Sequence, residues 1–274
     1  MKNLKRLFLL GGLFLLTGTV ANAELVNGVR QKPVPTATQA WVLSVDTTHN
    51  YYLYNPGAKA FFTEGNAWGT QVSIGNTGLK MAFTTPTVND VPVGVAVEDI
   101  PEDVYLLNDF SLHKRSWKLV FFENDNQMFV DRGNQANFGW GITPIEGTNN
   151  FRIHVSEYSE ISPDYNMDNY PEMFVGLDVT ENAENTVLSP FLEEGEGHYI
   201  DWTIITPDIY KAYLQAMDVY NKAQDLKAVI DEAKARGVNV AAQEAVYLNE
   251  AATIEETRSR YFRREDSSCF LCLC

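Results

Sequence analysis

The body of the sequence lacks cysteine. The chain has three cysteines, Cys269, Cys272 and Cys274, and all of them lie in its last six residues. Disulfide bonds therefore cannot hold the body together, and the fold depends on its hydrophobic core. The pattern Asn-x-Ser/Thr is also absent, so nothing points to eukaryotic N-glycosylation. Both absences favour a bacterial envelope or secreted protein over a small disulfide-bonded domain.

The sequence also lacks an apolar run long enough to cross a bilayer, which needs about 20 residues. The run at residues 7–16 is shorter, and it follows the positive charges of Lys2, Lys5 and Arg6. Ala21-Asn22-Ala23 then has the small-x-small pattern of a signal-peptidase site. Residues 1–23 are therefore predicted to be a signal peptide cleaved after Ala23, which implies a secreted or cell-surface protein.

Positive charge is scarce. Lysine and arginine number 21 against 36 aspartate and glutamate residues, for a formal net charge of −15. Loss of Lys2, Lys5 and Arg6 with the signal peptide would make it −18 (−15 minus 3). Phosphate backbones and anionic lipids are bound through lysine and arginine, so nucleic acid is excluded as a partner, and so is the membrane after signal cleavage.

Catalytic and metal-binding motifs are missing as well. No zinc spacing, Gly-x-Ser-x-Gly elbow or phosphate-binding glycine loop occurs, and the four histidines are far apart in sequence: His49, His113, His154 and His198. The acidic pairs Glu102-Asp103 and Glu193-Glu194 fit either a glycosidase or, more commonly, a solvated turn. The sequence thus predicts no catalytic residue, no cofactor and no enzyme.

Oxygen ligands do recur at alternate positions in one segment, at Asp164, Asn166, Asp168 and Asn169. The segment lacks the glycine and the closing glutamate of an EF-hand loop. We therefore predict no metal site.

Short strands dominate what is present. Residues 24–40 are predicted to be an extended lead-in, and residues 41–205 hold short aromatic and β-branched runs bounded by Asn, Asp, Gly and Pro. Three segments share an apolar residue followed by Phe and a polar turn, beginning at Phe61, Met128 and Met173. Each precedes a further strand-like run, beginning at Phe83, Phe151 and Trp202. These weak copies predict a pseudo-threefold barrel, although chance similarity between aromatic strands would give the same pattern.

The composition changes at Thr206. Thr206-Pro207-Asp208 is a helix start, an apolar stripe follows at three- and four-residue spacing, and Gly237 is placed to end the helix in a left-handed conformation. A second helix is expected over 240–251. We predict a helical hairpin over residues 206–257. Residues 258–274, rich in arginine and cysteine, are typical of a truncated or frame-shifted reading.

Two motifs carry a family resemblance. Tyr51-Tyr52-Leu53-Tyr54-Asn55-Pro56-Gly57 and Gly65-Asn66-Ala67-Trp68-Gly69-Thr70-Gln71 resemble the opening of β-trefoil-like domains of secreted and surface proteins of gut Bacteroidetes. The run from Trp202 to Ile205 into the helices resembles the module that follows in those chains. The resemblance covers about residues 41–256 and implies a mainly β, β-trefoil-like pseudo-threefold barrel followed by a helical hairpin. It implies little about activity. Ricin-like trefoils carry Gln-x-Trp in each lobe, whereas this chain has it once, at residues 39–41.

Aromatic and amide side chains on turns are the candidate ligand-binding residues, because sugar rings stack on aromatic faces and amides bind hydroxyls. They are Asn66, Trp68 and Gln71 in the first copy and Asn134, Gln135 and Trp140 in the second. The alternative is that both tryptophans are structural. The predicted function is a non-catalytic module that binds a glycan or a surface protein. A structural or adhesive domain without a small-molecule site, and an accessory fragment of a secreted enzyme, remain as alternatives.

Overall fold

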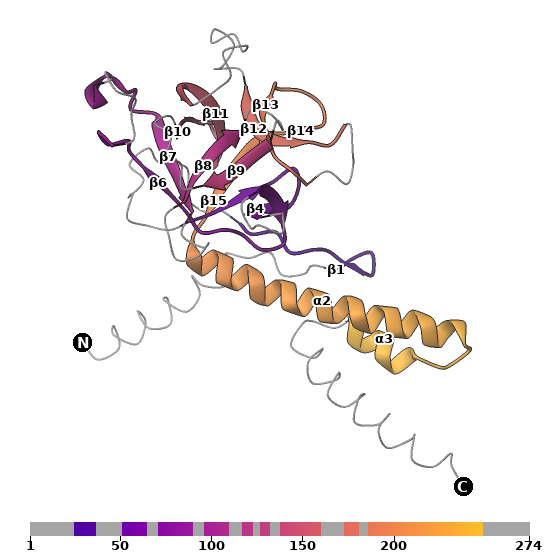
Figure 1. The fold of residues 1–274 in the computed structure, drawn as a ribbon. Helices are drawn as coiled ribbons and strands as arrows, with labels where there is room; N and C mark the ends of the chain where they lie inside the picture. The colour runs from indigo at the N-terminus through magenta and orange to yellow at the C-terminus, as the bar shows by residue number, and fades with distance from the viewer. Residues whose placement is uncertain are drawn as a thin grey trace, which may run out of the picture. The chain divides into compact units, whose positions relative to one another are not determined.

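The computed structural model describes residues 25–36, 51–64, 71–89, 96–109, 117–122, 127–131, 138–159, 173–180 and 186–248. The chain divides into two compact units. Residues 37–207 form the β unit, and residues 1–36 with 208–274 form the helical unit. Figure 1 shows the strands of the β unit and the helices of the helical unit.

The β unit contains three successive groups of four strands. The first group is β3 (Tyr52–Asn55), β4 (Ala60–Glu64), β5 (Val72–Gly75) and β6 (Met81–Thr84). After the 3₁₀ turn η1 (Val97–Asp99), the second is β7 (Val104–Asp109), β8 (Trp117–Phe122), β9 (Gln127–Asp131) and β10 (Phe138–Pro144). The third is β11 (Asn150–Ser159), β12 (Phe174–Asp178), β13 (Ser189–Leu192) and β15 (Asp201–Ile205), with the short β14 (His198–Tyr199) added before β15.

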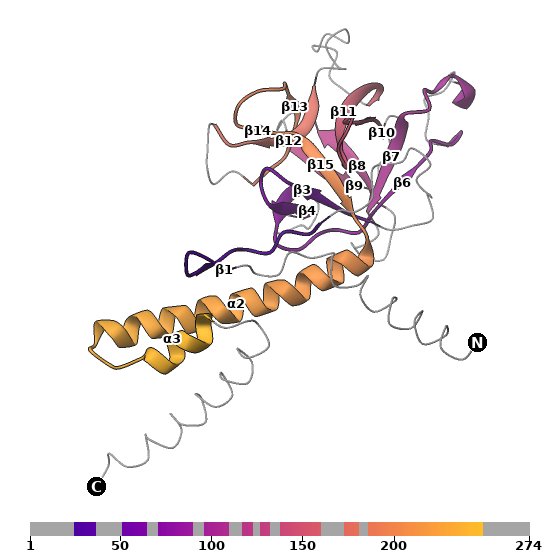
Figure 2. The same ribbon diagram turned by 180° about the vertical axis from the view of Figure 1, so that it is seen from behind.

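The first and fourth strands of the three groups close a ring. Antiparallel pairing runs from β6 to β7, β10, β11, β15 and β3. Tyr51 and Met81 complete it by exchanging two backbone hydrogen bonds of 2.7 Å between β3 and β6. The second and third strands of each group pair as β4–β5, β8–β9 and β12–β13. This is the predicted β-trefoil-like arrangement, seen from two sides in Figures 1 and 2.

The third strands of the three groups meet one another. Backbone bridges join Gln71 to Phe129 and Ser73 to Val187, and the Met128 N–H donates to the Leu188 carbonyl at 3.3 Å. These contacts join the three hairpins, and they pair backbone N–H and C=O groups that have no partner within their own set of four strands. The threefold pattern therefore extends from the ring to the hairpins.

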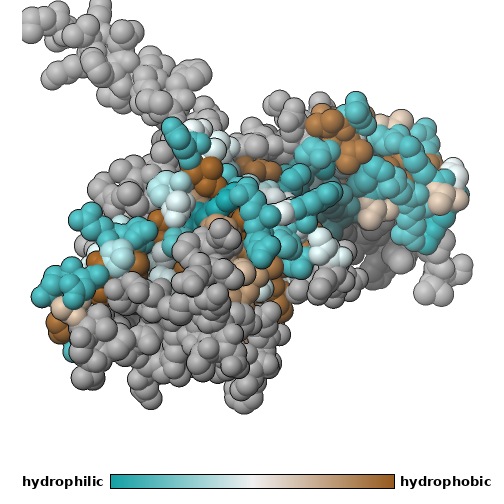
Figure 3. Space-filling view, turned by 90° about the horizontal axis from the view of Figure 1, so that it is seen from above, coloured by the Kyte–Doolittle hydropathy of each residue, from teal (hydrophilic) through white to brown (hydrophobic). Residues whose placement is uncertain are grey.

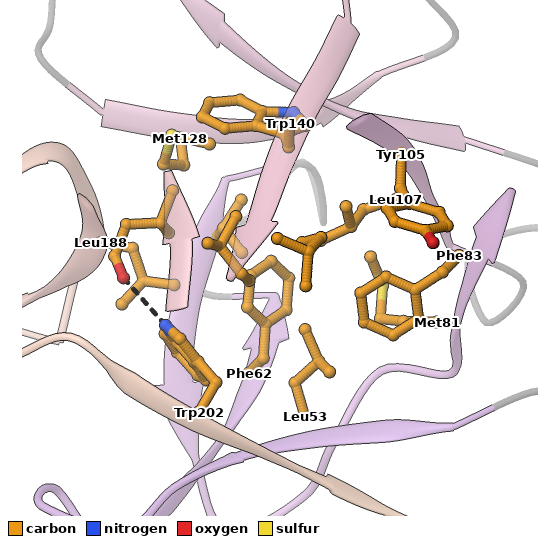
Figure 4. Close-up of a cluster of buried hydrophobic side chains, with 14 of the residues drawn as sticks. Leu53, Phe62, Met81, Phe83, Tyr105, Leu107, Met128, Trp140, Leu188 and Trp202 are labelled. Carbon is orange, nitrogen blue, oxygen red and sulfur yellow. Dashed lines mark hydrogen bonds between the residues drawn. The ribbon is translucent and has the colours of Figure 1, made fainter. Parts of the chain in front are cut away.

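Inward-facing side chains from all three groups fill one core (Figure 4). Phe62 meets Trp202 edge to face at 5.8 Å between ring centroids, and Phe83 meets Phe151 at 5.9 Å. Trp202 is fully buried and donates its indole N–H to the Val175 carbonyl at 2.8 Å. Since the body has no cysteine, this aromatic core is what the β unit has in place of covalent cross-links.

The phasing of the three sequence copies was wrong in the second copy. Phe61 and Phe174 both lie on second strands, β4 and β12, but Met128 lies on β9, a third strand. Of the residues that open the following runs, Phe151 lies near the start of β11, the first strand of its group, whereas Phe83 and Trp202 lie on the fourth strands of theirs. Apolar–aromatic pairs recur on any strand with an inward face, so the motif does not identify the strand's place in its group.

The helical unit contains α2 (Pro207–Ala235) and the shorter α3 (Ala241–Leu248). The predicted start at Pro207 is confirmed, and so is the left-handed Gly237, with φ of 78°. Gly237 N–H donates to Lys234 O at 2.9 Å and Val238 N–H to Ala233 O at 3.0 Å, the two bonds of a Schellman motif. Four residues at the core of this hairpin are buried: Ala223, Ile230, Val240 and Tyr247.

The N-terminal segment differs from its prediction as a plain extended lead-in. Strands β1 (Leu25–Val26) and β2 (Val29–Arg30) form a hairpin around Asn27-Gly28. Both turn residues have positive φ, 51° and 78°, as a two-residue hairpin turn of type I′ requires. Arg30 then lies buried against Tyr247 of α3. The segment is thus part of the helical unit.

The surface of the helices is mixed in character. Seen from above, hydrophobic side chains lie in small groups between hydrophilic ones (Figure 3). The exposed large apolar residues of these helices and their connection are Leu214, Val229, Val238 and Leu248. No helix in the described part of the chain is both long and apolar enough to span a membrane.

Candidate functional site

A polar cleft of about 240 Å³ opens in the β unit where the first and third groups of strands meet. Its walls come from three places: the turn after β3, the start of β11, and the segment from the β13–β14 loop to the start of β15. Among the lining residues are Asn55, Gly57, Asn150, Arg152, Glu194, His198, Tyr199 and Asp201. Strand pairing over long sequence separations therefore creates the site.

Asn55 joins the first wall to the third. This side chain is fully buried at the end of β3. Its Oδ1 accepts the Ala58 N–H at 2.9 Å, which closes the turn, and its Nδ2 donates to the Tyr199 carbonyl at 2.8 Å. Gly57, in the same turn, lies against the Tyr199 ring, so closely that an added Cβ would come within 2.7 Å of Cδ1. The ring position is thus set by the turn.

Arg152 is the charged centre of the cleft. Its Nη1 and Nη2 donate to the two carboxylate oxygens of Glu194 at 3.0 and 3.1 Å, and its Nε donates to Asp201 at 2.9 Å. The guanidinium also lies over the Phe174 ring at 5.2 Å from the centroid. Arg152 and Asp201 are direct partners in the β11–β15 register. The side chain is therefore held by a bidentate pair, a second carboxylate and an aromatic face.

This geometry sets the charge states of the site. The hydrogen bonds with Glu194 are the main cause that raises the pKa of Arg152, and they also lower the pKa of the Glu194 carboxyl. Glu194 thus stays ionised at neutral pH. A general acid of a glycosidase needs the opposite shift, a raised carboxyl pKa. The Glu194 carboxyl therefore lacks the shift in pKa that proton donation needs.

His198 stabilises the β13–β14 loop, which contains Glu194. Its Nδ1 lies 2.8 Å from the Glu193 carbonyl, and its Nε2 lies 3.7 Å from Asp178 Oδ2. Asp178 also accepts hydrogen bonds from the backbone N–H and the hydroxyl of Thr180, at 2.8 and 2.6 Å. The loop is thus tied at its base to the β12 strand end, and the cleft wall is built before any ligand arrives.

Of the six residues predicted as a ligand site, the structure describes two, Gln71 and Trp140. Trp140 was predicted on a turn; it lies in β10, is 1% exposed and packs in the core, because the alternation of the strand turns its side chain inward. Gln71 is partly buried and bridges to Phe129. Four of the predicted residues lie outside the described part of the chain: Asn66, Trp68, Asn134 and Gln135. The possible calcium ligands at 164–169 lie outside it too.

Most residues of the cleft were missed by sequence reasoning. Glu194 was considered as one of an acidic pair, and the structure gives it an arginine partner 42 positions away. Arg152 and Asp201 are 49 positions apart, and Asn55 and Tyr199 are 144 apart. No local motif reports these pairs, since they follow from strand register. Among the described residues, no group of three or more His, Cys, Asp or Glu side chains is placed to hold a metal ion.

No protein-family model matches the chain, and no curated protein matches its sequence. Among solved structures, SeviL bound to asialo-GM1 saccharide is similar with a TM-score of 0.37 and 11% identity, over 58% of this chain and 98% of that one. The Macrolepiota procera ricin B-like lectin in complex with lactose gives 0.36 and 14%, over 60% and 99%. A Clostridium perfringens endo-β-galactosidase releasing GlcNAcα1-4Gal gives 0.36 and 15%, over 58% of this chain and 33% of that one. At these scores the likeness assigns no ligand or activity.

Proposed function

We propose that the chain is an exported, non-catalytic module that binds carbohydrate in the cleft around Arg152. The observation that carries the proposal is the fixed geometry of that side chain. Glu194, Asp201 and the Phe174 ring hold it from three directions, so the polar groups of the cleft are oriented in advance. Preorganised groups lose little conformational entropy on binding, which is what a weakly bound, heavily hydrated ligand such as a sugar requires.

The chemistry of the walls matches sugar hydroxyls. Carboxylate oxygens of Glu194 and Asp201 accept hydrogen bonds, the amide of Asn150 both donates and accepts, and the partly exposed Tyr199 adds an apolar ring surface. Sugars present hydroxyls at their edges and C–H groups on their faces, so such a mixed wall complements both. A cleft of about 240 Å³ is small for a ligand site, so it suits a single sugar ring rather than a large ligand.

The absence of catalysis is part of the proposal. The two carboxylates on Arg152 share one cation, and the lowered pKa of Glu194 keeps it from acting as a general acid. Hydrolysis of a glycosidic bond needs one protonated and one ionised carboxyl across the bond. The site therefore favours retention of a sugar over its cleavage.

A glycan array with the purified full chain tests the proposal. Tyr199→Ala removes an aromatic ring that lines the cleft. Trp68→Ala removes the aromatic side chain that is predicted from the sequence to lie on a ligand-binding turn. Loss of binding in Tyr199→Ala alone supports the cleft. Loss in Trp68→Ala alone moves the site to the turn. No glycan bound by any of the three folded proteins would overturn the sugar proposal in favour of a structural or adhesive domain.

Export is tested separately. If residues 1–23 are removed as a signal peptide, the protein recovered from the envelope or the medium of an expressing bacterium begins at Glu24. N-terminal sequencing of that protein gives the answer. A chain that retains Met1 and stays in the cytoplasmic fraction would contradict export while leaving the sugar site unaffected.

A further inference from the structure

Arg152 is the one lysine or arginine among the residues that line the cleft. A guanidinium binds a carboxylate or a sulfate best through two parallel N–H donors. One fork of the guanidinium is formed by Nη1 and Nη2 and the other by Nε with an Nη nitrogen. In Arg152 both Nη1 and Nη2 are directed to Glu194, at 3.0 and 3.1 Å. Nε is used by Asp201 at 2.9 Å. The anion-binding edge of the arginine is therefore already covered by a carboxylate of the chain itself.

The two carboxylates that pair with Arg152 differ in their exposure to solvent, and so in how easily a ligand could displace them. The side chain of Arg152 is 21% exposed, that of Asp201 42% and that of Glu194 73%. An exposed ion pair is worth little energy in itself. Glu194 nevertheless competes as an intramolecular partner, with the high effective concentration that tethering gives, so an acidic sugar free in solution is at a disadvantage.

The charge balance acts in the same direction. Arg152, Glu194 and Asp201 together carry one net negative charge, and the whole chain carries −15. A ligand with its own carboxylate or sulfate is repelled on approach, and a ligand with an ammonium group is attracted. An uncharged sugar meets neither effect and is bound by its hydroxyls alone.

We infer that Glu194 is a specificity-determining residue, which blocks the anion-binding edge of Arg152 and restricts the cleft to uncharged or amine-bearing sugars, against uronic acids and sulfated sugars. This inference rests on the proposed sugar site. It assigns to Glu194 a role that differs from that of its neighbour Glu193. The side chain of Glu193 is exposed, and in the described structure it forms no hydrogen bond or ion pair with Arg152. The two glutamates therefore form a matched pair for experiment.

The test compares the full chain with Glu194→Gln and Glu193→Gln, which remove the same charge one residue apart. Calorimetric titration uses two matched sets of sugars: glucose, glucosamine and glucuronate, and galactose, galactosamine and galacturonate. We expect the unchanged protein to bind a neutral or amino sugar at least about tenfold more tightly than the matching uronate, the effect of one charge-assisted hydrogen bond. Glu194→Gln should reduce that preference about tenfold, and Glu193→Gln should leave it in place.

A second arm uses sulfate and needs no sugar. Sulfate should raise the melting temperature of Glu194→Gln, in which the Arg152 fork is open, more than that of the unchanged protein or of Glu193→Gln. Equal uronate and neutral-sugar affinity in the unchanged protein would overturn the inference, as would equal effects of the two substitutions in either arm. If no sugar binds any of the three proteins but sulfate distinguishes Glu194→Gln, the sugar site fails, and the block on the arginine stands.

Discussion

Arg30 and Tyr247, separated by 217 positions, are joined by three hydrogen bonds. The Arg30 guanidinium donates from Nε and Nη2 to the Tyr247 carbonyl at 3.2 and 2.9 Å, and the Arg30 backbone N–H donates to the tyrosine hydroxyl at 3.3 Å. The guanidinium also lies over the Tyr247 ring at 5.7 Å. The arginine therefore satisfies a carbonyl at the last turn of α3, where no helical partner remains, and it couples the N-terminal hairpin to the helices.

Arg30→Ala is expected to destabilise α3. Loss of the charge-assisted bonds leaves the Tyr247 carbonyl without these donors and should cost about 2 kcal/mol of local stability. Hydrogen exchange measured by mass spectrometry should show faster exchange over Ala241–Leu248. Gln31→Ala, which changes the adjacent exposed side chain, is the control and should leave exchange in α3 unchanged. Equal protection of α3 in both variants would show that the hairpin does not stabilise it.

Asn55→Ala is expected to destabilise the β unit. The substitution removes both the acceptor of the Ala58 N–H and the donor to the Tyr199 carbonyl, and each buried group loses a partner. We expect a loss of about 3 kcal/mol in the free energy of unfolding, measured by urea titration. Asn76→Ala, at an exposed turn position after β5, should change it by less than about 0.5 kcal/mol. A neutral effect of Asn55→Ala would mean that the turn and β14 are held together by packing alone.

Two glycines of the cleft are expected to respond differently to alanine. A Cβ at Gly57 would lie 2.7 Å from the Tyr199 ring, whereas a Cβ at Gly195 would meet nothing closer than 3.6 Å. Gly57→Ala should therefore destabilise the fold by about 2 kcal/mol, and Gly195→Ala should be neutral within about 0.5 kcal/mol. Thermal unfolding of the two variants side by side measures the difference. Similar melting temperatures would contradict the close approach of ring and turn.

Local signals predicted the class of the fold. Aromatic and β-branched runs between turn residues indicated short strands, and Pro207 and Gly237 marked the beginning and end of α2, because each acts within one helical turn. The Asn27-Gly28 pair is an equally local signal, because Asn-Gly favours the positive φ values of a two-residue hairpin turn. Where one or two neighbouring residues determine the backbone conformation, the sequence alone is sufficient to predict it.

Long-range register explains what could not be predicted. Trp140 is placed in the core by the direction in which β10 faces, and an aromatic residue next to amides has the same appearance in sequence on a turn or in a strand. The cleft depends on Arg152 standing opposite Asp201 across β11 and β15. A shift of one residue in that register would move the arginine to the other face of the sheet. Such pairs are determined by the whole ring of strands.

Tyr213→Phe is expected to change the response of the protein to alkali. Burial, with Tyr210 contributing, raises the pKa of Tyr213 to about 12 from an ordinary value of 10.0. The folded state thus favours the neutral phenol. Its contribution to stability is complete below about pH 10, and it is lost as the pH rises towards 12, because the unfolded chain releases this proton first. The loss at pH 12 is about 2 kcal/mol.

Phenylalanine has no proton to release, so Tyr213→Phe should lose less stability between pH 9 and pH 12 than the unchanged protein. Urea unfolding followed by circular dichroism at 222 nm, at steps of pH from 7 to 12, measures the two slopes. The values at pH 7 set the baseline for each protein, which separates the effect of titration from that of removing the hydroxyl. Parallel slopes in the two proteins would show that Tyr213 ionises as readily in the folded chain as in the unfolded one.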